Sequence, residues 1–331
     1  SAAPAVDRTV DWTARATGQA TDARLGRMLA RLQLLLLAAT VVVALAWLAW
    51  AVPAGVPLGW VAVGLLVALL PTAPVLAVEF ILLAVAGRDP AAPRASAVDL
   101  LRAWAGEVAA AWRVFSRDQP LFADAEPDVP ATPGRTGVLL VHGYFCNRGV
   151  WRPWLPRLRA LGVPCTALTL EPAFGRIDDW VPAIERAVAD LQQRTGRPPL
   201  VVAHSMGGLA TRAWLAAQPD AAAADARVRH VITIGTPHQG TWMARFGHTP
   251  NARQMRLGGR WLAALAQAEA PARRTRFTCF YGHADNIVFP ATTATLAGAD
   301  NRHLPAVAHV AMVQHPAVWQ AVLDHLQLAH H

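Results

Sequence analysis

The feature that most constrains the fold of this chain is the turn at Ser205, between a short apolar run and a helical pattern. Residues 200–203 have the length and the branched aliphatic composition of a buried strand, and a helical pattern begins near Met206. A serine on such a sharp strand-to-helix turn projects from the sheet edge, and its neighbours must be small. Ala203 and Gly207 meet this requirement. The alternative is a serine that caps an ordinary helix.

A second apolar run, residues 137–141, ends in the sequence His142-Gly143-Tyr144-Phe145. In strand–turn–helix sites of this kind, the loop after the upstream strand and the residue after the serine each supply a backbone N–H to a developing oxyanion. The sequence therefore predicts an oxyanion hole formed by the N–H groups of Tyr144 and Met206, with Phe145 as the alternative to Tyr144. We expect His142 to hold the loop rather than to transfer protons.

A candidate acid and a candidate base lie further along the chain. Asp285 follows a strand-like run at residues 276–281, and His309 precedes a final helical pattern. The chain order of serine, aspartate and histidine differs from the two protease orders that use the same three groups. Neutral His309 would remove the Ser205 proton and later return it, and Asp285 would orient the imidazole.

Other residues compete weakly for these roles. Asp300, the competing acid, lies in an expected turn before the last strand. His283, the competing base, lies in the same loop as Asp285, from which its ring is poorly placed to reach Ser205. Cys146 lies near the oxyanion loop, but Ser205 occupies the turn. The histidines show no metal spacing, so no metal site is expected. Three cysteines give no disulfide framework and fit a reducing compartment.

Four segments of the chain resemble the bacterial lipase and esterase branch of the α/β-hydrolases, two of them most similar to the small lidless lipases. The resemblance covers roughly residues 120–328 and implies hydrolysis of a lipid or other hydrophobic carboxylic ester, without a cofactor. The matching segments are Val141-His142-Gly143, Ala203-His204-Ser205-Met206-Gly207-Gly208, residues 233–241, and the stretch from Asp285 to His309.

The fold class expected from these patterns is α/β. Alternating strands and helices predict a mostly parallel sheet of about six strands with helices on both faces, and a site at the carboxyl ends of the strands. Only about one helix fits between residues 241 and 276, so no large lid is expected. Phe145, Trp242 and Met243 are candidates for a substrate groove, and core packing is the alternative for the latter two. Strands are expected near 137–141, 164–169, 199–203, 229–235, 276–281 and 302–306, and helices near 149–161, 179–194, 205–217, 257–268 and 316–327.

The N-terminal third has a different character, because residues 32–78 contain no Asp, Glu, Lys or Arg. A membrane-spanning helix needs about 20 apolar residues. Two spans fit, at residues 28–51 and at about 60–85, joined by a turn at 52–57, and Pro71 and Pro74 should kink the second. The alternatives are a buried helical pair in a soluble domain and a signal peptide, although two spans in series are long for the latter.

The arginines predict the orientation of these spans. Positively charged residues precede the first span and follow the second, and the connecting turn carries no charge. Both ends of the pair are therefore expected in the cytoplasm. The chain would then lie in a bacterial-type inner (cytoplasmic) membrane with its hydrolase domain in the cytoplasm. The flanking arginines are Arg8, Arg15, Arg24, Arg27 and Arg31 before the first span, and Arg88, Arg94 and Arg102 after the second.

Residues 97–115 show a helical apolar stripe that includes Leu101, Trp104 and Trp112. The stripe suits either a membrane interface or packing against the rest of the protein, and the sequence leaves both open. The expected organisation is an N-terminal cytoplasmic segment at 1–27, two transmembrane helices at 28–87, an amphipathic helix and linker at 88–119, and an α/β-hydrolase domain at 120–331.

The composition favours a membrane-associated protein over an ordinary soluble domain or a nucleic-acid-binding protein. The chain is 54% hydrophobic and only 16% charged, which is too apolar for an ordinary soluble domain. The net charge of +8 comes from scattered arginines without a nucleic-acid motif, and it fits anionic lipid headgroups better. The leading hypothesis is a membrane-anchored serine lipase or esterase. An acyltransferase, a thioesterase or a polyester hydrolase with the same three residues is the second, and a non-enzymatic membrane scaffold is the third. The sequence leaves the oligomeric state open.

Overall fold

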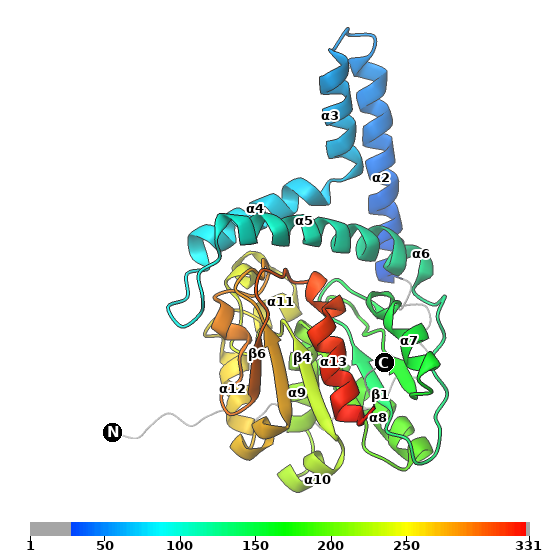
Figure 1. Ribbon diagram of the computed structural model, residues 1–331, viewed down its shortest axis with the longest axis vertical. Helices are drawn as coiled ribbons and strands as arrows, with labels where there is room; N and C mark the ends of the chain where they lie inside the picture. The colour runs from blue at the N-terminus through cyan, green and yellow to red at the C-terminus, as the bar shows by residue number, and fades with distance from the viewer. Residues whose placement is uncertain (1–27, 329–331) are drawn as a thin grey trace.

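The computed structural model describes residues 28–328, so the predicted segment 1–27 and the last two histidines, His330 and His331, lie outside the described residues. Six parallel strands form one sheet in the order β2-β1-β3-β4-β5-β6 (Figure 1). This confirms the predicted parallel sheet of about six strands. The strands are β1 Val138–Val141, β2 Cys165–Ala167, β3 Leu200–His204, β4 His230–Ile234, β5 Phe277–Tyr281 and β6 Asp300–His303.

The last strand differs most from its predicted position. β6 begins at Asp300, two residues before the predicted start at 302, because Asp300 already pairs with Thr278 of β5. Asp300 therefore belongs to the edge strand and not to the turn in which the sequence placed it. The hydrogen bond from Leu304 N to Tyr281 O continues the ladder just beyond the strand.

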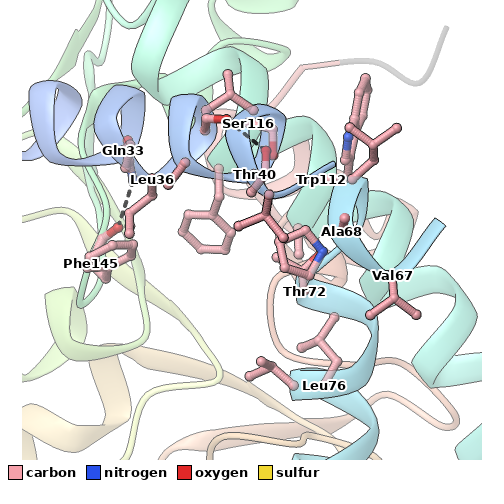
Figure 2. Close-up of a pocket in the computed structure, with 18 of the residues that line it drawn as sticks. Gln33, Leu36, Thr40, Val67, Ala68, Thr72, Leu76, Trp112, Ser116 and Phe145 are labelled. Atoms are coloured by element: carbon pink, nitrogen blue, oxygen red, sulfur yellow. Dashed lines mark hydrogen bonds between the residues drawn. The ribbon is translucent and has the colours of Figure 1, made fainter. Parts of the chain in front are cut away.

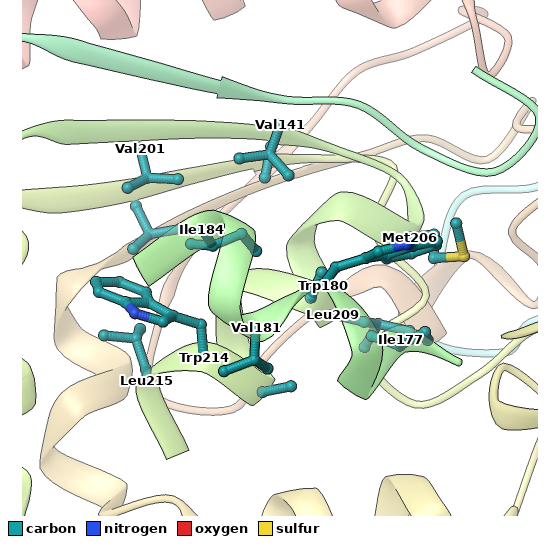
Figure 3. Packing of buried hydrophobic residues seen from close by; sticks show 14 of the residues in the cluster. Val141, Ile177, Trp180, Val181, Ile184, Val201, Met206, Leu209, Trp214 and Leu215 are labelled. Atoms are coloured by element: carbon teal, nitrogen blue, oxygen red, sulfur yellow. The ribbon is translucent and has the colours of Figure 1, made fainter. Parts of the chain in front are cut away.

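The two faces of the sheet are covered by separate helical layers. Along β3, Val201 and Ala203 point to one core and Leu200 and Val202 to the other, as the two-residue period of a strand requires. Figure 3 shows the first core, where Trp180 and Trp214 fill the space between the sheet and its helices. Helices α8 Val181–Thr195, α9 Met206–Ala216 and α12 Arg260–Ala268 cover the first face, and α7 Trp154–Ala160 and α13 Pro316–Leu326 cover the second.

Three of the predicted helices, α7, α8 and α12, begin two or more residues later than expected. Short 3-10 turns at Arg148–Trp151 and Ile177–Trp180 precede α7 and α8, whose first turns contain or follow a proline. Proline lacks an N–H and fits only the first turn of a helix, so the regular helix starts there. The sequence did not predict the short helices α10 Ala221–Ala226 and α11 Pro250–Gln254. Further 3-10 turns are Trp242–Phe246, Pro271–Arg276, Ala291–Ala294 and Ala311–Gln314.

The N-terminal third forms a separate group of helices. α2 and α3 lie side by side and project away from the sheet (Figure 1), and Trp47 Nε1 of α2 donates a hydrogen bond to Val61 O of α3 at 3.0 Å. The helices are α2 Met28–Ala51, α3 Leu58–Leu69, α4 Thr72–Ala86, α5 Ala97–Arg113 and α6 Gln119–Phe122, with a π-helical turn, η1, at Val114–Asp118.

Within residues 28–328, only α2 is by itself long and apolar enough to cross a membrane. The second predicted span is divided into α3 and α4, which meet at an angle of 76°. Pro71 lies at this break, where it cannot donate the hydrogen bond that would continue α3. At 1.5 Å per residue, the 12 residues of α3 cover roughly 18 Å.

Helices α4 and α5 lie across the end of the sheet that carries the strand carboxyl termini (Figure 1). Phe80 and Leu83 of α4 and Ala103 of α5 form an apolar cluster with Ala284, Phe289 and Ala308 of the hydrolase loops, which we call the helix–loop cluster. The face of α5 that is buried consists of Ala103, Glu107 and Ala111. The predicted apolar stripe of α5 therefore faces largely elsewhere, with Leu101 64% and Trp112 46% exposed.

The packing of α9 against β1 makes a test of the fold possible. A Cβ atom at Gly207 would lie 2.5 Å from the backbone oxygen of His142, whereas a Cβ at Gly106 of α5 would meet nothing within 4 Å. We expect Gly207→Ala to destabilise the protein by about 1–3 kcal/mol through overpacking. Gly106→Ala should stabilise it by up to about 1 kcal/mol through helix propensity. Thermal unfolding in detergent measures both, and equal melting temperatures would contradict the close approach.

Candidate active site

Ser205 occupies the turn between β3 and α9 in a strained backbone conformation. Its φ is 53° and its ψ is −128°, a combination that residues with a Cβ rarely adopt. Two hydrogen bonds hold it there: Ser205 N donates to Ile234 O at 2.8 Å, and Thr236 Oγ1 donates to Ser205 O at 2.8 Å. Strain of this kind persists only where the surroundings fix it, and it is common at catalytic nucleophiles.

Glycines make room for this turn on two sides. A Cβ at Gly143 would lie 2.7 Å from the Cβ of Ser205, and a Cβ at Gly208 would lie 2.2 Å from Thr236 Oγ1. The loop after β1 therefore lies directly against the serine, which brings Tyr144 beside the turn. The sequence requirement for small residues around Ser205 thus extends to the neighbouring loop.

Asp285 and His309 form a hydrogen-bonded pair at the same edge of the sheet. His309 Nδ1 lies 2.9 Å from Asp285 Oδ2, and Asp285 Oδ1 accepts the backbone N–H groups of Ile287 and Val288 at 2.9 and 2.8 Å. Both side chains are at least 94% buried. The carboxylate is thus fixed by the backbone, and donation from Nδ1 leaves Nε2 as the nitrogen that can accept a proton.

Gly235 connects this pair to the serine. It follows Ile234, the residue that accepts the Ser205 N–H, and a Cβ at Gly235 would lie 3.0 Å from His309 Nδ1. The structure therefore brings Ser205, Asp285 and His309 together at one sheet edge. Within the described part of the chain no hydrogen bond joins Ser205 Oγ to His309, and such catalytic bonds often tighten only when substrate binds.

The surroundings of His309 favour its charged form. Burial by itself lowers the pKa of the imidazole, but the charge and hydrogen bond of Asp285 and the charges of two glutamates together outweigh it. These glutamates are Glu107 and Glu79, and the pKa of His309 is raised above its ordinary value. An imidazolium formed during proton transfer is accordingly stabilised.

Sequence reasoning missed these two glutamates as parts of the site. Glu107 of α5 is buried, and its two oxygens accept the backbone N–H groups of Val310 and Ala311, directly after His309, at 2.8 and 2.9 Å. Glu79 of α4 accepts a hydrogen bond of 2.7 Å from Asn286, whose own side-chain oxygen accepts the His309 N–H at 3.3 Å. The only local signal was Glu79 as the single acidic residue of the apolar helix α4, and Glu107 had no such signal, because α5 also carries Asp99.

Burial keeps Glu107 partly protonated near neutral pH. It raises the pKa of this carboxyl from 4.5 to about 7, although the hydrogen bonds from Val310 and Ala311 and the charge of His309 act in the opposite direction. The charge of this carboxyl and the charge of His309 influence each other, since each group shifts the pKa of the other.

The predicted oxyanion donors lie beside Ser205. Met206 is the first residue of α9, where N–H groups have no acceptor within the helix. Phe145 has a φ of 55°, so the chain turns sharply after Tyr144, in the loop that Gly143 holds against Ser205. The oxyanion hole formed by these two N–H groups stays a prediction.

Two further histidines support this loop and the base. His142 Nε2 accepts a hydrogen bond from Leu170 N at 2.8 Å, and its Nδ1 lies 2.9 Å from Gly143 O, in agreement with the predicted structural role. Burial lowers the pKa of His142 to about 4, which keeps the ring neutral. The ring of His204 packs against His309 at 4.7 Å between centroids, and burial also lowers the pKa of His204.

The competing residues lie elsewhere. Asp300 is exposed and pairs with Arg302 at 2.8 Å. His283 contacts the ring of His303, with 2.9 Å between their nitrogens, and does not contact Asp285. Burial raises the pKa of the Cys146 thiol to about 12, so it carries no thiolate at neutral pH. Among residues 28–328, no group of three or more His, Cys, Asp or Glu side chains could hold a metal ion.

The three residues predicted to line a substrate groove, Phe145, Trp242 and Met243, lie at two different places in the structure. Phe145 lines a cavity of about 630 Å³ between the N-terminal helices and the oxyanion loop (Figure 2). Trp242 and Met243 do not line this cavity and pack against the helix–loop cluster, where Trp242 stacks on Phe289. Phe246, next to Trp242, is 56% exposed.

Comparisons with known proteins agree with this architecture. Residues 138–329 match the model of the Alpha/beta hydrolase family. The solved structure of mature Bacillus licheniformis lipase BlEst2 is similar with a TM-score of 0.52 and 17% identity, over 60% of this chain and 95% of the lipase. Aspergillus fumigatus lipase B is similar with a TM-score of 0.53 and 21% identity, over 62% of this chain and 57% of the lipase. These likenesses show a shared fold. A search of curated proteins gave no match.

The raised pKa of His309 leads to a prediction on nucleophile reactivity. We expect the rate at which a fluorophosphonate labels Ser205 to fall as the pH is lowered through the pKa of His309, because the imidazolium cannot accept the serine proton. The midpoint should lie above 6.5, the ordinary histidine value.

Replacing Glu107 tests the cause of this shift. Glu107→Gln removes a neighbouring negative charge, so the midpoint should move to lower pH. Asp190→Asn, on the exposed face of α8, should leave it unchanged. An identical midpoint in the wild-type protein and in Glu107→Gln would contradict an electrostatic role for Glu107.

Proposed function

Because the chain belongs to the Alpha/beta hydrolase family, we propose that it is a membrane-anchored serine carboxylic-ester hydrolase, of the lipase or carboxylesterase type, that acts on lipid or other hydrophobic esters. The observation that carries this proposal is the buried hydrogen bond of 2.9 Å between His309 and Asp285, next to a serine held at positive φ on a strand-to-helix turn. A binding protein has no need of all three groups in this arrangement.

In the proposed mechanism, His309 Nε2 takes the Ser205 proton while the serine oxygen attacks the ester carbonyl carbon. The N–H groups of Met206 and Tyr144 stabilise the tetrahedral oxyanion, each worth about 3–4 kcal/mol in comparable enzymes. His309 then protonates the leaving alcohol, and an acyl-enzyme forms. Water, deprotonated by His309, attacks the acyl carbonyl, and the carboxylic acid and free Ser205 are released. Asp285 stabilises the imidazolium in both halves of the reaction.

The same acyl-enzyme can also be formed from a thioester or a polyester, or transferred to an acceptor other than water. We favour a hydrophobic ester because the N-terminal helices beside the site expose apolar residues and line an apolar cavity next to Phe145. The two fold relatives described above are named lipases, which agrees with this preference.

We further propose that α2 and α3 form a membrane hairpin whose turn reaches the far interface, with the bilayer thinned around it because α3 covers only roughly 18 Å. Its side walls expose large apolar residues such as Leu35, Val42 and Leu66 at 60–70%. Trp50 and Trp60 flank the turn and are 60% and 67% exposed, as expected of tryptophans at a membrane interface. The remaining apolar surface of α4 and α5, where Ile81 and Leu101 are exposed, suits the near interface.

The orientation proposed for this hairpin follows from its flanking arginines. Both ends of the hairpin meet the hydrolase domain, which is therefore in the cytoplasm, with the protein in an inner (cytoplasmic) membrane. We propose three segments that differ in composition, at residues 28–87, 88–119 and 120–331. They are not independent folding units, because Glu79 and Glu107 form hydrogen bonds with loops of the last segment.

Hydrolysis of p-nitrophenyl esters from C2 to C16 by detergent-solubilised protein tests the proposed activity. We expect turnover that falls at least about 10⁴-fold in Ser205→Ala, because the three residues act as a unit. His309→Ala should fall by a similar factor. Absence of turnover on every ester, together with intact folding and no fluorophosphonate labelling of Ser205, would leave the scaffold hypothesis.

Membrane topology is tested with a single exposed cysteine at the hairpin turn. The three native cysteines are buried, so Ala54→Cys offers the accessible thiol. A membrane-impermeant maleimide should label it in intact spheroplasts, whereas Asp190→Cys on the hydrolase should label only after lysis. Labelling of Asp190→Cys in intact spheroplasts would contradict a cytoplasmic hydrolase domain.

A further inference from the structure

We propose that the cavity between the N-terminal helices and the Phe145 loop binds the acyl chain of the ester, and that the chain enters it sideways from the bilayer. This inference rests on the proposed function, since it takes Ser205 as the point where the chain must end. It assigns to the N-terminal helices a substrate-binding role beyond anchoring.

The walls of the cavity suit a hydrocarbon chain. Its volume of about 630 Å³ falls in the usual range for small-molecule sites, roughly 300–1,000 Å³. Figure 2 shows aliphatic side chains from three helices around it, with Phe145 on the hydrolase side. A polar ligand would lose its hydrogen bonds to water along such walls, whereas an alkyl chain loses none. The apolar lining residues of α2, α3 and α4 are Leu36, Leu37, Ala39, Val43, Val67, Ala68, Leu69, Val75 and Leu76.

One boundary of the cavity is polar and connects to the catalytic groups. Gln33, which lines the cavity, donates a hydrogen bond to Phe145 O at 3.4 Å in the oxyanion loop. Glu79 also lines it and is one hydrogen bond away from Asn286, which bonds to the backbone of His309. The cavity therefore adjoins the loop at Phe145 directly and is linked to the backbone of His309 through Glu79 and Asn286.

The rest of the cavity rim opens onto the apolar surface of the helices. Leu36, Val43, Val67 and Val75 line the cavity and are also 50–59% exposed, so each contributes to the wall and to the outer surface. In the proposed membrane arrangement these side chains contact lipid. An acyl chain that moves from the bilayer into the cavity thus stays in apolar surroundings throughout. Ser205, by contrast, is only 5% exposed, so an open approach from water is narrow.

This cavity is a feature of this chain rather than of the matched hydrolase region. Phe145 is the only lining residue within residues 138–329, and all the others lie between Gln33 and Ser116. The acyl site is therefore assembled by joining the N-terminal helices to the hydrolase. Each methylene buried there should raise kcat/KM by up to about fourfold, as expected for transfer of one methylene out of water.

A matched pair of substitutions on α2 tests the inference. Ala39 lines the cavity, whereas its neighbour Ala38 does not, and both are exposed on the helix. Full-length wild-type protein, Ala39→Trp and Ala38→Trp are placed in nanodiscs of diether phosphatidylcholine, a lipid without an ester to cleave. Hydrolysis of p-nitrophenyl acetate and p-nitrophenyl palmitate is measured for each.

The inference predicts that Ala39→Trp lowers the ratio of palmitate to acetate turnover by about tenfold or more, because the indole occupies space meant for the chain. Ala38→Trp should keep the wild-type ratio. An unchanged ratio in Ala39→Trp with normal acetate turnover would overturn the acyl site while leaving the proposed function intact. Absence of turnover of both the acetate and the palmitate ester in the wild-type protein would refute the proposed function itself.

Covalent mapping in the wild-type protein provides a second measurement. A fluorophosphonate with a 12-carbon chain and a terminal diazirine is attached to Ser205, activated by light, and located by mass spectrometry. Crosslinks should fall within residues 36–43 or 67–76. Crosslinks confined to residues 242–246 would overturn the inference and assign the chain to the hydrolase surface instead.

Discussion

The close contact between the loop after β1 and the turn at Ser205 is the constraint on which the rest of the site depends. With a Cβ at Gly143 or Gly207, the loop would collide with the serine or α9 with β1. Because the two elements touch, Tyr144 of the loop and Met206 of α9, the predicted oxyanion donors, both lie next to residues that contact the turn at Ser205, which has a strained φ of 53°. The catalytic geometry is thus a consequence of backbone packing, and side chains from other strands are added around it.

The histidine of this site depends on helices that the family model does not include. A buried carboxylate is tolerated only where hydrogen bonds replace water, and Glu107 finds two such donors in the backbone after His309. Glu79 extends the same connection through Asn286. The N-terminal helices consequently fix the loop that carries the proposed base and supply negative charge to it. The N-terminal helices, proposed as a membrane anchor, are therefore also structurally part of the candidate active site.

The apolar surfaces of the N-terminal helices suggest why this arrangement is useful. The same helices present exposed aliphatic residues on their outer faces and line a cavity next to the oxyanion loop on their inner faces. A hydrophobic ester is poorly soluble in water and concentrates in the bilayer. In the proposed function, one set of helices would both hold the enzyme at its substrate and receive the substrate's chain. The cavity and the proposed membrane contact would then be formed by the inner and outer faces of the same helices.

The sequence by itself determined the six strands, the turn at Ser205 and the order of Asp285 and His309, because each depends on a local period or on a few adjacent residues. The sequence predicts a kink at Pro71, but it does not predict the angle of 76° or the packing of α4 against the hydrolase loops that accompanies it. Only the tertiary structure decided that Glu107 contacts Val310, 203 residues away, that Trp242 and Met243 pack under α4, and that a cavity forms beside Phe145. Contacts between elements that distant depend on how whole helices dock, and no local pattern of residues encodes the docking geometry.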